Sequence, residues 1–452
     1  MPENTSEQSS RELLEGVIAD LDTGRTDHLL ETLENIHPAD IANLLESLPP
    51  EVRSALWEVV PAVQEGDILS YMRDEARTTI IKKMDHGELL AAAESMDVED
   101  LVEVLEEMPD DLSESIMIEL DQDHRHRVEN ILSYDDGTAG RLMNTDVASV
   151  RKDVTLAVVL RWLRRHHSLP KHTDALIVTD ENGQYLGMLP MEIIVTGDPS
   201  TVVETVMQVG TMPVRTVTDE MEVAALFERR DLISVAVVDE NQYLLGRITI
   251  DDIVDVIRED ADQTVFKNAG LEKEEDLFSP IFPSTKRRGI WLGINLVTVF
   301  LAAWVIGRFE EVLEKIVALA ILMPIVASMG GIAGSQTLTL IIRGMALNQI
   351  VKSNVRWLVI KELMVGFLNG LVWAIVVGVV AFLWFNNSGI AAILGVAMTI
   401  NLLAAVLSGV TIPLILQKIG LDPALSGAVI LTTVTDIVGF LSFLGLSSLF
   451  LI

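Results

Sequence analysis

The pattern of hydrophobic and polar positions divides the chain near residue 281 into two parts. Before this point apolar residues recur at short intervals among many charges, and after it they form long uncharged stretches. A membrane-spanning helix needs about 20 mainly apolar residues. Stretches of this kind cover 289–307, 316–342, 363–417 and 423–452. The turn sequence at 386–389 divides the longest stretch, so we predict five membrane spans.

The charges between these spans predict their orientation. Basic residues lie before the first span, between the second and third, and between the fourth and fifth: Lys286, Arg287, Arg288, Arg343, Lys352, Arg356, Lys361 and Lys418. Basic loops favour the cytoplasmic side of a membrane. We therefore expect a multi-pass protein of the plasma (inner) membrane, with the N-terminal domains in the cytoplasm and the C-terminus outside.

The first part begins with a helical pattern. Residues 1–24 are polar and predict a flexible N-terminus. Over 25–133 apolar positions recur every three or four residues, which is typical of helices. The segment 39–49 is similar to 99–109, and a weaker copy lies between them. Repeated short helices predict a helical N domain built as a small solenoid.

From about residue 144 the pattern changes to strands that alternate with helices. The segment 175–187 recurs as 235–246, each predicting two strands around an acidic turn. The two units resemble a tandem pair of CBS domains, at 134–197 and 198–258. This resemblance implies a nucleotide site at Thr249 and Asp252, with ATP as its ligand. Asp252 as a cap of the following helix is an equal alternative.

Composition sharpens the contrast between the parts. The 452-residue chain has a net charge of −33 and a mean hydropathy of +0.37. The charge is −37 before residue 281 and +4 after it. The acidic part would repel nucleic acid but attract cations. The absence of cysteine excludes disulfides and thiol chemistry, and we find no catalytic constellation, so we do not expect an enzyme.

Asp436 is the one acidic residue deep within a span. An intramembrane carboxylate is costly and points to function, although a protonated structural Asp is the alternative. Mg²⁺ keeps most of its waters and needs only one or two carboxylates, and a symmetric dimer would bring two copies of Asp436 to one axis. Glu362 and Asp422 are expected near the membrane interface. Glycines at 330, 331 and 334 permit either close helix contacts or an unwound wet segment.

The order of solenoid, CBS pair and five spans resembles the MgtE family of Mg²⁺ channels. The matching motifs are 134–143, 307–314, Pro324, the glycine-rich 330–336, Lys361-Glu362, 422–425 and Thr435-Asp436. The resemblance implies a helical connecting (plug) region at 259–284 and a pore domain at 285–452. The implied fold class is a multidomain α-helical membrane protein with α/β CBS domains.

The resemblance also implies a homodimer, embedded in membrane lipid, with a pore at its axis. Asp436 would meet hydrated Mg²⁺, and the pore-lining candidates are Gly330, Gly331, Gly334, Gln336, Ala428, Thr432 and Thr435. Two departures concern selectivity, because Ile332 and Ala428 stand where the family usually has Asn.

Regulation is implied as well. In the family, cytosolic Mg²⁺ binds acidic residues and closes the pore, so Mg²⁺ is both substrate and regulator. The regulatory candidates are Asp100, Asp219, Asp231, Asp252, Asp255 and Asp260. Two other functions remain open at this point. One is transport of broader selectivity, including Mn²⁺ or Co²⁺, or coupled exchange; the other is a membrane-anchored nucleotide sensor.

Overall fold

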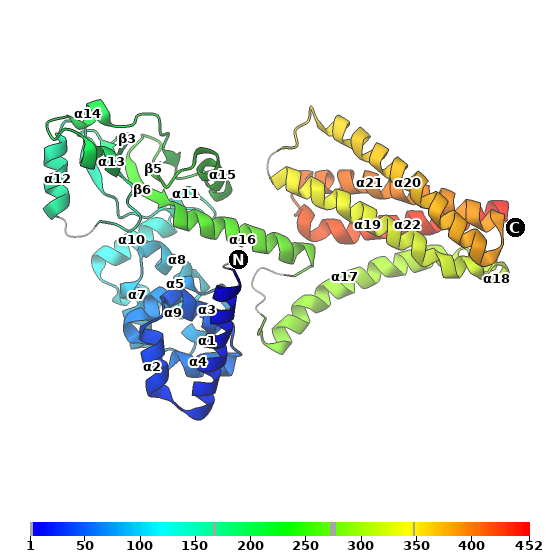
Figure 1. Ribbon diagram of the computed structural model, residues 1–452, viewed down its shortest axis with the longest axis horizontal. Helices are drawn as coiled ribbons and strands as arrows, with labels where there is room; N and C mark the ends of the chain where they lie inside the picture. The colour runs from blue at the N-terminus through cyan, green and yellow to red at the C-terminus, as the bar shows by residue number, and fades with distance from the viewer. Residues whose placement is uncertain (1–2, 166–168, 272–276, 347–348) are drawn as a thin grey trace. The chain divides into compact units, whose positions relative to one another are not determined.

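A computed structural model describes residues 3–165, 169–271, 277–346 and 349–452. It falls into two compact units, which we describe separately (Figure 1). The first holds the chain up to Ala261 together with 277–279. The second holds 262–271 and the chain from Pro280 onward.

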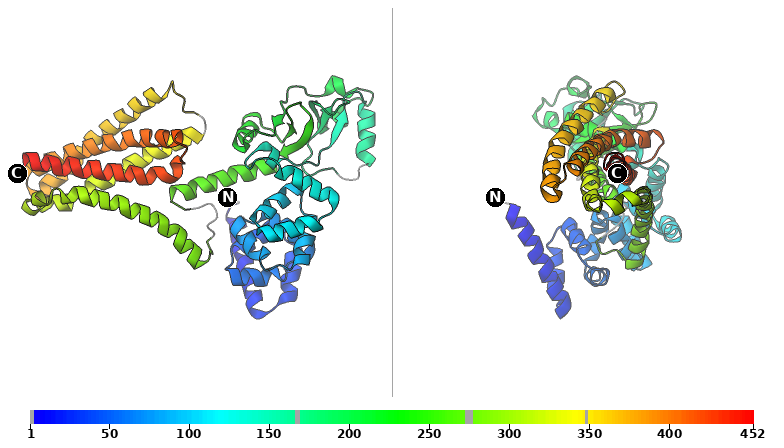
Figure 2. Two further views of the ribbon diagram at one scale, coloured as in Figure 1. Left: turned by 180° about the vertical axis from the view of Figure 1, so that it is seen from behind. Right: turned by 90° about the vertical axis from the view of Figure 1, so that its right-hand side faces the viewer.

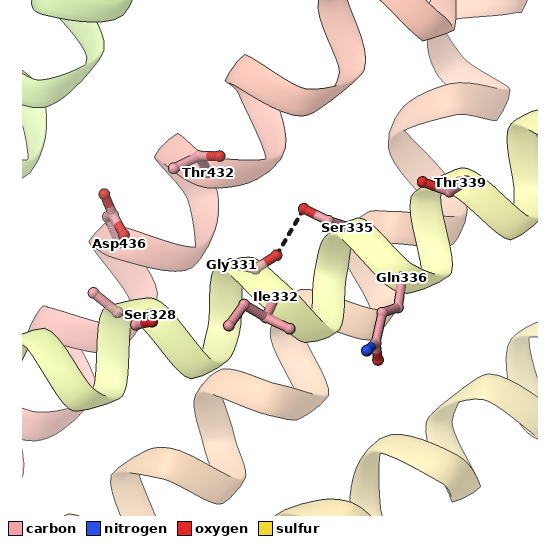
Figure 3. Close-up of a pocket in the computed structure, with 9 residues that line it drawn as sticks. Ser328, Gly331, Ile332, Ser335, Gln336, Thr339, Thr432 and Asp436 are labelled. Carbon is pink, nitrogen blue, oxygen red and sulfur yellow. Dashed lines mark hydrogen bonds between the residues drawn. The ribbon is translucent and has the colours of Figure 1, made fainter. Parts of the chain in front are cut away.

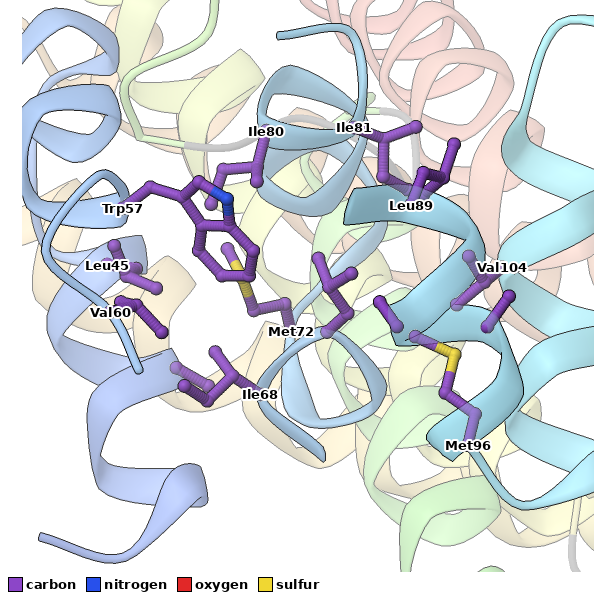
Figure 4. Packing of buried hydrophobic residues seen from close by; sticks show 14 of the residues in the cluster. Leu45, Trp57, Val60, Ile68, Met72, Ile80, Ile81, Leu89, Met96 and Val104 are labelled. Carbon is purple, nitrogen blue, oxygen red and sulfur yellow. The ribbon is translucent and has the colours of Figure 1, made fainter. Parts of the chain in front are cut away.

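The first unit begins with short helices. They are α1 (Glu3–Thr23), α2 (Thr26–Glu34), α3 (Pro38–Glu46), α4 (Pro50–Trp57), α5 (Glu65–Tyr71), α6 (Asp74–Ile81), α7 (His86–Ser95), α8 (Val98–Glu107), α9 (Asp110–Glu119) and α10 (Gln122–Leu132), with a 3₁₀ turn at Ala62–Gln64. Their apolar faces enclose one core, in which Leu45, Ile68 and Val104 are fully buried (Figure 4). The helical solenoid predicted from the repeat is therefore present.

A buried arginine recurs in this helical array. Arg53 donates from Nε to the carbonyl of Leu45 at 2.8 Å, and Arg77 donates to the carbonyl of Leu69 at 3.4 Å. Both guanidinium groups are almost fully buried. The carbonyls at the end of a helix lack partners within that helix. Each arginine therefore caps the helix that precedes it and ties consecutive repeats together.

Residues 3–23, expected to be flexible, form α1. Leu13, Leu14 and Leu21 lie three or four residues from the buried Val17, and all four pack in the core. Asp20 is also buried and pairs with Arg25 at 2.6 Å. A weak apolar stripe in a polar segment is sufficient to dock a helix when a preformed core is available.

Two small sheets follow, linked by helices. The elements are α11 (Ala139–Leu142), β1 (Ser149–Arg151), α12 (Leu156–Arg165), β2 (Ala175–Thr179), β3 (Tyr185–Pro190), α13 (Met191–Thr196), α14 (Val203–Val206), β4 (Val214–Arg215), α15 (Glu220–Arg230), β5 (Ser234–Val238), β6 (Leu244–Thr249) and α16 (Ile250–Asn268). In each sheet the first two strands are parallel and the last two antiparallel. The matching registers show that the two units are structural copies, as the repeat predicted. The helix α16 runs past the expected boundary at 258.

The second unit is a bundle of long apolar helices. They are α17 (Ile281–Gly307), α18 (Glu310–Lys315), α19 (Ala318–Ala346), α20 (Val355–Phe385), α21 (Ser388–Lys418) and α22 (Pro423–Phe450). All but α18 are long and apolar enough to cross a membrane, which confirms the five predicted spans. Asn386 adopts a left-handed conformation and Asn387 caps α21, so the predicted turn is present. The helices α19, α20 and α22 all pack on α21 (Figure 2).

Candidate ion pathway and carboxylate cluster

The membrane unit has an open cavity between α19 and α22. Its volume is about 690 Å³, and it is lined by Ala327, Ser328, Gly331, Ile332, Ser335, Gln336, Thr339, Thr432 and Asp436. Figure 3 shows Asp436 and Thr432 projecting from neighbouring turns of α22 beside the α19 ribbon. The cavity therefore brings together four of the predicted pathway residues, which are Gly331, Gln336, Thr432 and Asp436. Ile332, the departure from the family pattern, also lines it.

Hydrogen bonds within the helices leave Asp436 available to a ligand. Thr432 donates from Oγ1 to the carbonyl of Ala428 at 2.9 Å, and Ser335 donates to Gly331 at 2.8 Å. Among the described residues Asp436 has neither a hydrogen bond nor an ion pair. Its half-buried carboxylate can therefore accept hydrogen bonds from a hydrated cation.

Four other predicted pathway residues do not line the cavity. Gly330 and Gly334 are buried against neighbouring helices, and Thr435 is fully buried. A Cβ at Gly334 would come within 2.9 Å of the Leu431 side chain. Ala428 is not among the lining residues, and its carbonyl accepts the hydrogen bond from Thr432. The described α19 is helical throughout, so its buried glycines serve close contact between helices.

The two interface candidates both have partners. Glu362 on α20 is 4% exposed; it pairs with Lys361 and accepts a hydrogen bond from Thr337 at 3.3 Å. Asp422 caps α22 by accepting from the Ala424 amide at 2.8 Å. Asp422 also pairs with Lys267, in the last turn of α16, at 3.0 Å. A charged contact thus joins the end of α16 to the start of α22.

In the first unit, acidic residues in α8 and at its N-cap lie near acidic residues of α16. We call this group the carboxylate cluster: Asp97, Glu99, Asp100, Glu103, Asp252 and Asp255. Three of the predicted regulatory residues, Asp100, Asp252 and Asp255, belong to it. Lys171 pairs with Asp97 at 3.0 Å, at one edge.

Burial and mutual repulsion shift the acidities in the carboxylate cluster. Burial, with a smaller contribution from neighbouring Asp residues, raises the pKa of Glu99 to about 8 and that of Asp100 to about 7. Burial also raises the pKa of Asp252 to about 6, opposed by hydrogen bonds from Thr249. These are the shifts expected when like charges share a poorly solvated site. A divalent cation would relieve the repulsion.

The remaining three regulatory candidates lie elsewhere. Asp219 caps α15, accepting from the amides of Met221 and Glu222 at 2.9 and 3.3 Å. Asp231 ends the same helix in a left-handed conformation, with φ of 50°. Asp260 is exposed on α16. Within the described residues none of the three belongs to the carboxylate cluster.

Comparison with known proteins identifies the chain. Its segments match three family models: the divalent cation transporter MgtE at 323–446, the MgtE intracellular N domain at 36–137, and the CBS domain at 139–197 and 203–259. The magnesium transporter MgtE of Thermus thermophilus is 31% identical over 437 residues, which cover 95% of this chain and 97% of the relative. The chain belongs to the MgtE family.

Two further comparisons extend over different parts. The magnesium transporter MgtE of Bacillus subtilis is 27% identical over 97% of this chain and 98% of its own length. A solved structure described as the cytosolic domain of the Mg²⁺ channel MgtE in complex with ATP is 31% identical. It covers 54% of this chain and 99% of its own, with a TM-score of 0.51. The chain is therefore a membrane protein of a magnesium transporter family.

The structure adds residues that the MgtE resemblance did not supply. Glu99 accepts from the Asn144 side-chain amide, and its second oxygen is buried without a partner among the described residues. Arg77 donates to Glu103 and Glu107 at 2.5 Å, with Asp74 at 3.4 Å. The sequence gives no signal for this group, because positions 74 and 77 are far along the chain from 103 and 107. Only the fold brings them together.

The nucleotide candidates in this MgtE chain form a helix cap. Thr249 donates from its backbone amide and from Oγ1 to Asp252, both at 3.0 Å. Its Oγ1 also approaches Asp251 at 2.5 Å. A side chain three residues into a helix that accepts from the capping residue is half of a capping box. The capping alternative stated for Asp252 is thus realised in this structure.

Proposed function

We propose that this chain forms a homodimeric Mg²⁺ channel whose pathway follows α19 and α22. The observation that carries the proposal is the open cavity holding Asp436. It combines one free carboxylate with hydroxyl and amide groups on a membrane helix. Hard cations bind oxygen ligands, and Mg²⁺ retains waters that such groups can accept.

The exposure of side chains that line the cavity supports assembly from two chains. Ile332 is 55% exposed, and Thr432 and Gln336 are also exposed. Exposed polar groups in a membrane helix normally face a partner or water rather than lipid. A twofold axis along this face would enclose the cavity and set two Asp436 carboxylates against one divalent ion.

Cytosolic Mg²⁺ would regulate the channel at the carboxylate cluster. Without the ion, the six carboxyl groups of the carboxylate cluster lie near one another where α8 meets α16, and their ionised forms repel. Binding of Mg²⁺ reverses the sign of that interaction and holds the N domain against α16. The contact between Lys267 and Asp422 at 3.0 Å offers a route from α16 to the pore helix α22. We assign Asp219, Asp231 and Asp260 to the same response, at contacts between the two acidic subunits.

The topology follows from the basic loops. Lys418 and the basic residues before α17 and between α19 and α20 would face the cytoplasm. This places the soluble domains inside the plasma (inner) membrane and the C-terminus outside. Mg²⁺ entering along the pathway would then reach the side that carries the carboxylate cluster, so accumulated substrate limits further entry.

The test is Mg²⁺ flux into liposomes, with internal Mg²⁺ varied. We expect wild-type flux to fall as internal Mg²⁺ rises, and Asp436→Asn to abolish flux at all concentrations. Thr433→Val is a control on the same helix outside the cavity, and it should carry wild-type flux. Undiminished flux through Asp436→Asn would overturn the pathway assignment.

The position of Ile332 favours a broader ion selectivity. Ile332 is apolar, exposed and part of the cavity wall, where an amide would accept hydrogen bonds from metal-bound water. Its presence favours a channel that also passes Mn²⁺ or Co²⁺. Competition of these ions with Mg²⁺ in the same liposomes distinguishes the two selectivities.

The nucleotide alternative rests on the relative solved with ATP, and equilibrium binding of ATP to the wild type and Thr249→Ala tests it.

A further inference from the structure

We propose that Asn401, on α21 and outside the cavity, is the positioning residue that holds the two walls of the ion pathway in register. This inference rests on the proposed function of α19 and α22. Asn401 is fully buried in the apolar bundle. Its amide nitrogen donates to the backbone carbonyl of Val326, on α19, at 2.8 Å.

Two glycines accommodate the Asn401 amide from opposite helices. A Cβ added at Gly330 on α19 would lie 2.2 Å from the Asn401 nitrogen, and one at Gly439 on α22 would lie 2.8 Å from it. Neither separation is possible for real atoms without movement. The amide therefore occupies the junction of three helices, and only glycine at both positions leaves room for it.

This junction directly abuts the cavity. Val326 and Gly330 precede Ala327 and Gly331, which line it. Gly439 lies three residues after Asp436, which is less than one helical turn. A shift of α19 or α22 at the Asn401 amide would therefore change the separation between Asp436 and the wall formed by Gly331 and Ser335.

The hydrogen bonding of Asn401 argues against a purely stabilising role. The carbonyl of Val326 already has a partner position in its own helix, the amide of Gly330. The Oδ1 atom of Asn401 is buried and has no hydrogen-bond partner within the part of the chain that the structure describes. A buried acceptor without a donor is costly, and an apolar residue of similar size would avoid that cost. What the amide adds is a directional contact that an apolar side chain cannot make.

The first experiment measures Mg²⁺ flux in single variants and in a double variant that removes both the amide and the glycine. Losing one net hydrogen bond changes the population of an aligned state by about fivefold, so we expect Asn401→Ala to lower Mg²⁺ flux about fivefold. Gly330→Ala should lower it further, because its methyl group collides with the amide. In the double variant the amide is absent, and flux should recover to the level of Asn401→Ala alone. Gly445→Ala is the control, because a Cβ there meets no atom within 4 Å.

The second experiment measures position without relying on transport. The chain has no cysteine, so Ser335→Cys and Thr432→Cys place the only thiols on the two cavity walls. We expect a short bifunctional thiol reagent to cross-link them within one chain, at a rate changed about fivefold by Asn401→Ala and unchanged by Gly445→Ala. Only variants whose unfolding temperature in detergent equals that of the wild type are compared.

The outcomes separate the two proposals. Both proposals are supported if Asn401→Ala changes the cross-linking rate and if Asp436→Asn abolishes the flux that the wild type shows. A changed rate in a wild type that carries no Mg²⁺ supports the role of Asn401 and overturns the proposed function. Equal cross-linking rates in all folded variants overturn the role of Asn401, as does a double variant no better than Gly330→Ala.

Discussion

Mg²⁺ binding at the carboxylate cluster should release protons. Glu99, Asp100 and Asp252 have pKa values raised to about 8, 7 and 6, chiefly by burial. A carboxylate binds metal in its ionised form, so protons that remain at a given pH must leave. With these pKa values, roughly 1.5 protons per chain should be released at pH 7 and about 0.1 at pH 9.

The same numbers set the pH dependence of affinity. Releasing roughly 1.5 protons makes the apparent Mg²⁺ affinity rise roughly thirtyfold per pH unit near pH 7, and the dependence should vanish above pH 9. Proton release is measured by adding Mg²⁺ to the purified chain in weak buffer with a pH indicator. Titration calorimetry in buffers of different ionisation enthalpy gives the same count independently.

Two variants make the measurement specific. Glu99→Gln removes the group with the highest pKa, so release at pH 7 should fall by about 0.9 proton. Glu181→Gln is the control, because Glu181 is an exposed carboxylate of the first CBS unit, 3.4 Å from Arg151. Equal proton release at pH 7 and pH 9, or none at pH 7, would refute the assignment of Mg²⁺ to this cluster.

Three further outcomes follow from the same contacts. Carboxyls with raised pKa favour the folded state in their neutral form; without Mg²⁺ the unfolding temperature of the soluble region should therefore fall from pH 5 to pH 8, and Mg²⁺ should restore it. Arg77→Ala leaves Glu103 and Glu107 without their counter-charge and should destabilise the N domain by about 3 kcal/mol in urea unfolding. Lys267→Ala removes a half-exposed pair worth at most about 1 kcal/mol, so the internal Mg²⁺ that halves flux should shift less than about fivefold.

The membrane helices could be predicted because their signal is local. A stretch of 20 uncharged residues has few alternatives to a span, and the asparagines at 386 and 387 favour a turn by their own conformational preferences. The helix α1 could not be recognised with the same certainty. Its four leucine and valine positions are diluted by polar residues, and their packing depends on a core formed by later helices.

The residues of the candidate site likewise fall into some that the sequence predicts and some that only the fold reveals. Asp436 stands out because a carboxylate in a span is rare. The glycines of α19 left two interpretations open, and the choice depended on Asn401, which is about 70 residues further along the chain. Glu99 gave no signal, because an acidic residue in an acidic helix is ordinary until a neighbour such as Asn144 covers it. Long-range packing, rather than local pattern, decides these cases.

The proposed pathway and the proposed sensor make opposite demands on an acidic site, and their compositions differ accordingly. A pathway must bind an ion strongly enough to admit it and weakly enough to let it leave. Asp436, which has no hydrogen bond or ion pair among the described residues and lies beside neutral oxygens, would meet that requirement for an ion that keeps its water. A sensor must hold its ion, and the proposed one has six carboxyl groups, of which Glu99, Asp100 and Asp252 are partly buried. Such a group gains more from a divalent charge because repulsion is relieved as well. Proton competition at Glu99 and Asp100 would limit this gain near pH 7, and the proposed sensor would then also release its ion when Mg²⁺ is scarce.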